Sequence, residues 1–150
     1  MADVAVKTNV MEAVKTALKT IPEVLTVERI PAKGVDLDVA PMPAIFFYDE
    51  DENRGRRNRV ATGAVNIIVF GYIPLLMEGY KDVNDLADLV QGRIHNVMTQ
   101  HSLTGNPLIQ NIVEGKVYKD YPNDEYMLLI MTFTVTYLHN WGDAFSNAGY

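Results

Sequence analysis

The side chains with the most chemical potential in this sequence form one run of eleven residues, Asp49-Glu50-Asp51-Glu52-Asn53-Arg54-Gly55-Arg56-Arg57-Asn58-Arg59. Asp49, Asp51 and Asn53 imitate the start of a calcium-binding loop, in which oxygen ligands alternate along the chain. Such a loop also requires glycine at its sixth position and glutamate at its twelfth. These positions hold Arg54 and Val60, so the sequence predicts no calcium site.

No other group of residues has the pattern of a catalytic or metal-binding site. The sequence has no cysteine, which excludes disulfides, thiolate metal sites and thiol nucleophiles. His95 and His101 lie six residues apart in a predicted helix, about 120° around its axis, so they do not share a face. Ser102 and Ser146 lack the Gly-x-Ser-x-Gly setting of a nucleophile. We expect no enzymatic activity, cofactor or metal ion; the alternative is a small-ligand enzyme with a pocket between sheet and helices.

The charged run is better suited to contact with another protein. It lies between apolar segments at 44–48 and 65–70 that are typical of β-strands. A hairpin normally needs two to five connecting residues, whereas this connection is about ten residues long and predicts a charged loop at 49–59. Arginine pairs bidentately with carboxylates at interfaces. Adjacent acidic and basic stretches also suit a head-to-tail contact between copies, which closes into a ring.

We therefore predict an oligomer or partner interface. Its expected residues are Asp49, Glu50, Asp51, Glu52, Arg54, Arg56, Arg57, Arg59, Trp141 and Phe145. The two aromatic residues are included because large aromatic side chains in a tail of small residues need to be buried. Two other interpretations stay open: a mobile solvated loop, and a nucleic-acid contact in which the arginines bind phosphates.

Composition and charge are those of one globular domain. The chain has 150 residues, of which 48% are hydrophobic and 21% charged. The N-terminus lacks a signal pattern, and the most apolar segment, 64–77, is too short for a membrane span. We expect a soluble protein made in the cytoplasm. The charged run is neutral overall, so the net charge of −6 belongs to the other segments. An acidic body repels phosphate and disfavours tight nucleic-acid binding.

Periodicity predicts the elements in the order α-β-β-β-α-β-β. The first helix spans about 5–20, with Asn9 and Glu12 as a capping box, and the second begins after Asp82. The strands lie near 25–30, 44–50, 60–73, 111–118 and 126–139, and an edge strand at 35–39 is considered. Side chains along 60–73 and 126–139 are predicted to alternate between the two faces of the sheet. This order predicts an α+β fold: a mostly antiparallel sheet of four to five strands with two helices packed on one face. We expect one domain at 1–139 and a C-terminal tail at 140–150.

This layout resembles the tail terminator proteins of long-tailed bacteriophages, which complete the tail and join it to the head. The similarity covers length, element order and character across nearly the whole chain. Its local cues are Pro43-Ala44-Ile45-Phe46-Phe47-Tyr48, the charged loop, Val69-Phe70-Gly71-Tyr72 and the threonine-rich last strand. Head-side neck proteins and minor tail proteins share the same fold and are the alternative within this resemblance.

The resemblance implies a structural virion protein without enzymatic activity. It would form a ring, expected to be hexameric, that caps the tail tube and meets the head connector or neck protein. In such proteins the long hairpin loop is often poorly ordered alone and settles on assembly. Genome DNA would pass through the ring without tight binding, which an acidic body favours on electrostatic grounds. A nucleic-acid-binding accessory domain is the less favoured alternative.

Overall fold

The computed structural model describes residues 6–30, 40–57, 60–80, 82–101, 109–140 and 143–147. Its elements follow the predicted order and add one short strand at the end. They are α1 (Val6–Leu18), β1 (Thr26–Arg29), β2 (Ala44–Arg57), β3 (Val60–Pro74), α2 (Val83–Asn96) with a π turn (Val97–His101), β4 (Ile109–Asp120), β5 (Tyr126–Asn140) and β6 (Asp143–Asn147). The edge strand considered at 35–39 lies outside the described residues.

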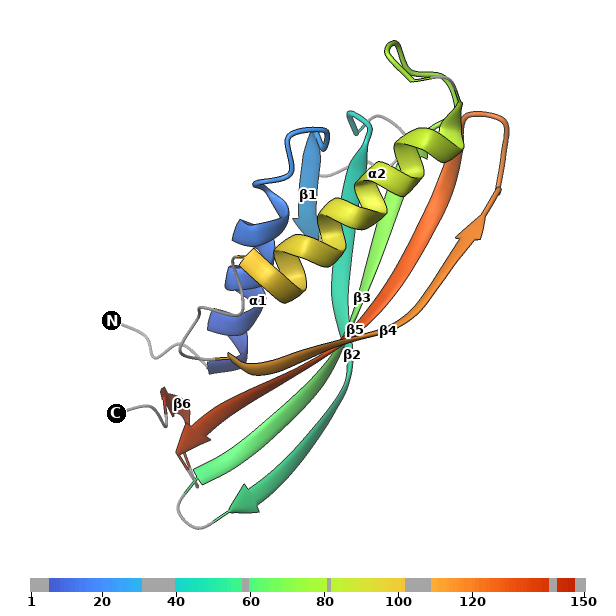
Figure 1. Cartoon of the computed structure of the whole chain (residues 1–150). Helices are drawn as coiled ribbons and strands as arrows, with labels where there is room; N and C mark the ends of the chain where they lie inside the picture. Colours follow the sequence, from blue (N-terminus) through green and yellow to red (C-terminus); the bar gives the residue numbers. More distant parts are fainter. Residues whose placement is uncertain are drawn as a thin grey trace.

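The strands form one sheet in the order β1-β2-β3-β5-β4, and β6 pairs with the end of β5. Among the described strands only β1 and β2 run parallel to each other. Both helices lie on the same face of the sheet (Figure 1). The predicted α+β class, with its mostly antiparallel sheet and one layer of two helices, is confirmed. Part of the predicted tail is the strand β6, whose backbone pairs with β5.

The hydrophobic core lies between the helices and the sheet face that they cover. Along β3, alternate residues are buried in this core: Val65, Ile67, Val69 and Ile73. The same alternation runs along β5 through Met127, Leu129, Met131, Phe133 and Val135. Because side chains of a strand alternate between faces, this pattern fixes which face of each strand meets the helices. The alternation predicted from the sequence is therefore confirmed for both strands.

The two helix starts differ in how well the sequence predicts them. Asp82 caps α2 as predicted, because its carboxylate accepts hydrogen bonds from the backbone amides of Asn84 and Asp85. The predicted capping box at Asn9 is wrong, since α1 already begins at Val6 and Asn9 lies inside the helix. An ion pair between Lys7 and Asp49 of β2 ties the first turn of α1 to the sheet. This tertiary contact overrides the local signal.

The predicted ten-residue loop at 49–59 is also wrong. β2 continues to Arg57 and β3 starts at Val60, and these two residues are paired, so only residues 58 and 59 separate the strands. Residues 52–57 of β2, 60–64 of β3 and 136–140 of β5 form an extension, here called the arm. The start of β4 and the strand β6 also pair with this part of β5. Figure 1 shows these strands continuing past both helices.

The arm exists because of a mismatch in length. Strands β3 and β5 have 15 residues each and span roughly 50 Å, whereas helices of 13 and 14 residues span about 20 Å. β3 pairs with β5 over its whole length, from Val60 opposite Asn140 to Pro74 opposite Tyr126. This pair presents backbone hydrogen-bonding groups to β2, so the charged residues 52–57 take part in the ladder.

A glycine allows close packing where the core meets the arm. Gly63 of β3 lies opposite Tyr137 of β5, and the tyrosine is fully buried. A Cβ atom at Gly63 would lie 2.7 Å from both Cε1 and Oη of Tyr137. The ring therefore occupies the space that a side chain on β3 would need.

We expect Gly63→Ala to lower the free energy of unfolding by about 1–3 kcal/mol, because the tyrosine ring must move out of a packed site. Gly92→Ala is the matched control. Gly92 lies in α2 with open space around it, so alanine there should be neutral or stabilising by up to about 1 kcal/mol. Urea unfolding of the three proteins measures both effects. Equal stability of Gly63→Ala and the unmodified protein would contradict the packing argument.

Candidate interaction surface

Within the part of the chain that the structure describes, one edge of the sheet is open along the charged residues. The pairing of β1 with β2 runs from Ala44 to Phe47, and the Ile30 amide donates a hydrogen bond to the Phe47 carbonyl at 2.8 Å. Among the described residues, no strand pairs with the outer edge of β2 from 48 to 57. Open strand edges can add a further strand through their free backbone groups. This edge is the strongest candidate for contact with another chain.

The opposite edge of the sheet is β4, which is better protected against the addition of a further strand than the β2 edge is. Two register shifts interrupt its pairing with β5, one near Ile109 and one between Glu114 and Val117. Lys116 and Lys119 add exposed positive charge. Bulges and lysines are the devices with which native sheets discourage unwanted strand addition. The β2 edge has one register shift, between Asp49 and Glu52, and both signs of charge.

Asp49, the first predicted interface residue, is engaged within the chain. Its carboxylate lies 2.7 Å from the Lys7 ammonium of α1 and 2.8 Å from the Arg29 guanidinium of β1. The aspartate side chain is only 21% exposed. It thus ties together α1, β1 and β2 where the helix-covered part of the sheet ends. Asp49 is thus engaged within its own chain, and its predicted contact with a partner stays a prediction.

The electrostatics of this cluster favour a charged Asp49. Burial by itself would raise the pKa of the carboxyl, but hydrogen bonds from Lys7 and Arg29 outweigh it. The net effect lowers the pKa of Asp49 from its ordinary value of 3.8 to about 2. The carboxylate is therefore ionised at every pH at which most proteins stay folded, and the cluster persists across that range.

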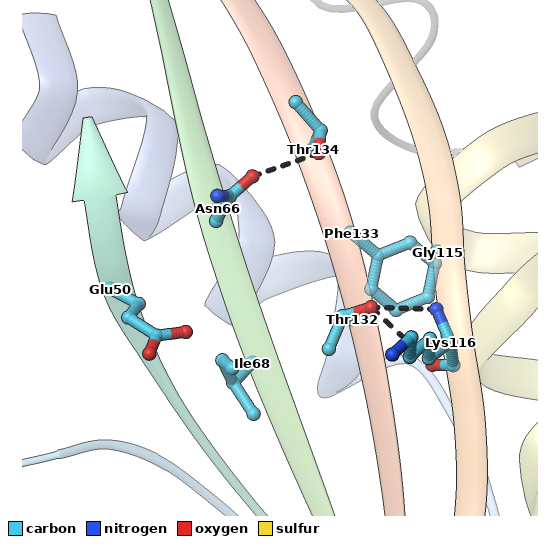
Figure 2. Close-up of a pocket in the computed structure, with 8 residues that line it drawn as sticks. All are labelled: Glu50, Asn66, Ile68, Gly115, Lys116, Thr132, Phe133 and Thr134. Atoms are coloured by element: carbon cyan, nitrogen blue, oxygen red, sulfur yellow. Dashed lines mark hydrogen bonds between the residues drawn. The ribbon is translucent and has the colours of Figure 1, made fainter. Parts of the chain in front are cut away.

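Glu50 points to the other side of the sheet, the face without helices, and lines a shallow hollow of about 270 Å³ there. Figure 2 shows this hollow lying across the four strands from β2 to β4. Thr134 donates a hydrogen bond to Asn66 at 2.9 Å, and Thr132 accepts one from the Lys116 amide at 2.8 Å. The surface of the hollow is mainly apolar, and Glu50 and Lys116 lie at its margin.

An aromatic cluster continues this helix-free face beyond the hollow. Tyr48 stacks on Phe70 with ring centroids 5.7 Å apart, and Tyr72 contacts both Phe46 at 5.6 Å and Tyr126 at 5.1 Å. All of these rings except Phe46 are half-buried rather than buried. Sequence reasoning missed this cluster as a surface, although the apolar character of both β3 faces signalled it.

The structure places the other predicted residues unevenly. Asp51, Glu52, Arg54, Arg56 and Arg57 all lie in β2 and follow the open edge. Phe145 lies in β6, which pairs with β5 beside the arm and also lies next to α1. Arg59 and Trp141 fall outside the described residues. Five charged residues are therefore brought together on one strand, and their predicted contacts with a partner stay a prediction.

Several charged residues of the body are paired within the chain. Arg93 of α2 contacts Glu23 at 3.0 Å, and Lys15 of α1 contacts Glu28 at 3.2 Å. Lys119 of β4 lies 3.1 Å from Asp88 of α2. These pairs join each helix to a neighbouring loop or strand.

The comparisons with known proteins add no relative. No model of a known protein family matches the chain, and no curated protein is detectably similar to it. Within the described residues, no helix has both the length and the apolar character needed to cross a membrane.

The Asp49 cluster predicts a pH-dependent stability. Asp49→Asn should lower the free energy of unfolding at pH 7 by about 1 kcal/mol, a value reduced by solvent screening of a partly exposed cluster. The pKa of Asp49 is lower in the folded than in the unfolded state. The stabilisation is therefore complete above about pH 4 and is lost as the pH falls towards 2.

Urea unfolding of both proteins between pH 7 and pH 2 measures this loss. Glu50→Gln is the control, because it removes the same charge from an exposed neighbour and should change stability by less than about 0.5 kcal/mol. A difference between Asp49→Asn and the unmodified protein that stays constant down to pH 2 would show that the charge does not stabilise the fold.

Proposed function

We propose that this protein is a non-enzymatic structural virion protein of the tail terminator type. It would form a ring, expected to be a hexamer, that caps the tail tube and joins the tail to the head connector. The observation that supports this proposal best is the arm, whose strands are more than twice as long as the helices that cover them. A self-contained domain has no need of such an extension, whereas an assembling subunit uses it to reach a neighbour.

The distribution of surfaces also favours assembly into a closed ring. A ring requires two different surfaces of each copy to meet, since a head-to-tail contact repeats until it closes. The protein offers the β4 edge on one side of the sheet, the arm at one end, and the helix-free face with its aromatic cluster. Aromatic residues are enriched at protein interfaces, where they supply large contact areas.

The acidic body suits a conduit for DNA. The net charge of −6 lies outside the run 49–59, which is itself neutral. A surface of this sign repels phosphates, so DNA can move past it without being held. The same charge argues against an accessory domain that binds nucleic acid through its arginines. Head-side neck and minor tail proteins of the same fold remain the alternative assignment within the virion.

We expect the purified protein to exceed its monomer mass of 16.8 kDa and to form rings. Light scattering coupled to size exclusion across a concentration series gives the mass, and negative-stain electron microscopy gives the symmetry, with tail tubes added in a parallel sample. Rings bound at tube ends would support the terminator assignment. A protein that stays monomeric at high concentration, and that forms no rings by itself or on tail tubes, would contradict the proposed ring.

Gel shifts with duplex DNA at low and moderate salt separate the nucleic-acid alternative. Binding through arginine–phosphate contacts would weaken steeply as salt rises. We expect no shift at either salt concentration. A shift that is abolished by Arg56→Glu together with Arg57→Glu would show that the arginines bind nucleic acid, and would contradict their assignment to a protein interface.

A further inference from the structure

We propose that the open edge of β2 pairs with the same edge of a second copy, antiparallel and about a two-fold axis at Asn53. This assigns a partner and a symmetry to the edge at 48–57. The contact is independent of the ring, because an isologous contact is complete with two copies. If rings form, it would join one ring to another.

The charges along β2 are self-complementary about Asn53. An antiparallel pair centred on this residue places each position opposite the one at the same distance on the other side. Glu52 then faces Arg54 of the second copy, and the symmetry repeats this pair. Glu50 lies before the register shift and points to the helix-free face, so it is not part of this facing set. Opposite charges in directly facing positions stabilise a strand pair, and like charges destabilise it. A parallel pair in register would instead place acid against acid and arginine against arginine.

The backbone of β2 offers hydrogen bonds in the same register. Phe47 directs its carbonyl outwards to Ile30 of β1, so it belongs to the alternate set of residues that face away from β3. The register shift between Asp49 and Glu52 moves this set by one residue. Beyond the shift, Glu52, Arg54 and Arg56 carry the outward backbone groups.

This set fits the two-fold axis without further adjustment. Residues that face each other in an antiparallel pair exchange two hydrogen bonds when both direct their backbone groups across. About Asn53, Glu52 of one copy and Arg54 of the other are such a pair, and the symmetry repeats it. Backbone register and charge pattern, which are separate properties of the strand, therefore select the same axis.

The described structure leaves room for the second copy. β1 ends its pairing at Phe47, and the helices lie over the opposite end of the sheet (Figure 1). The carboxylate of Asp49 is bound to Lys7 and Arg29 of its own chain. The contact with the second copy is therefore formed by the residues of β2 that follow Asp49. A second copy is favoured over an unrelated chain because the edge supplies its own complement.

Three charge variants test the proposal by sedimentation over a concentration series. Arg54→Glu with Arg56→Glu leaves only acids along the edge, and Glu50→Arg with Glu52→Arg leaves mainly arginines. Each should weaken two-fold association at least tenfold, and an equimolar mixture of the two should restore it. The quadruple variant with all four changes exchanges the two signs, so it should associate as the unmodified protein does.

The quadruple variant separates this contact from other uses of the charges. A heterologous contact with β4 or another protein would be broken by the exchange, so a monomeric quadruple variant overturns the proposal. Failure of the two single-sign variants to recombine does the same. If two-fold pairs form but rings do not, only the proposed ring is contradicted. If rings form but the edges of β2 do not pair, only the two-fold contact is contradicted.

Amide hydrogen exchange on the unmodified protein provides a test without substitutions. The amides of Glu52, Arg54 and Arg56 should exchange more slowly at high than at low protein concentration, while those of the helices stay unchanged. Exchange rates along β2 that do not depend on protein concentration would contradict the pairing. An unmodified protein that stays monomeric would contradict it as well.

Discussion

The pairing of β3 with β5 is the constraint on which the rest of the structure depends. Fifteen consecutive residues of β3 face fifteen of β5 without a register shift, the longest uninterrupted ladder in the described structure. It fixes which side chains enter the core, because a slip of one residue would turn every side chain to the other face. It also carries β2 along beyond the helices, and so produces the arm.

The two faces of this ladder have different tasks. One face packs on α1 and α2 with residues such as Ile67 and Phe133, which are fully buried. The other carries Asn66, Phe70 and Thr134, all half-buried, in a mixture of aromatic and hydroxyl side chains. A face made only for solvent would be polar throughout, since alternation normally leaves polar residues outside. The composition of the second face is that of a surface partly removed from water.

The sequence predicted those features that local patterns determine, such as the alternation along β3 and the cap at Asp82. It failed where distant residues decide. The Asp49 cluster could not be predicted, because its members Lys7 and Arg29 lie 42 and 20 positions away from Asp49 in the chain. The length of β2 could not be predicted either, because charged residues have low intrinsic strand preference and accept the strand only where a neighbouring ladder is already formed.

The Asp49 cluster marks the boundary between the helix-covered body and the arm, in which backbone ladders join β2, β3 and β5. Because side chains of a strand repeat every two residues, strands can lose or gain residues in pairs beyond this boundary without turning any core side chain outwards. The length of the arm can therefore change without a change in the stability of the folded body. Relatives could bridge gaps of different width with arms of different length on the same folded body.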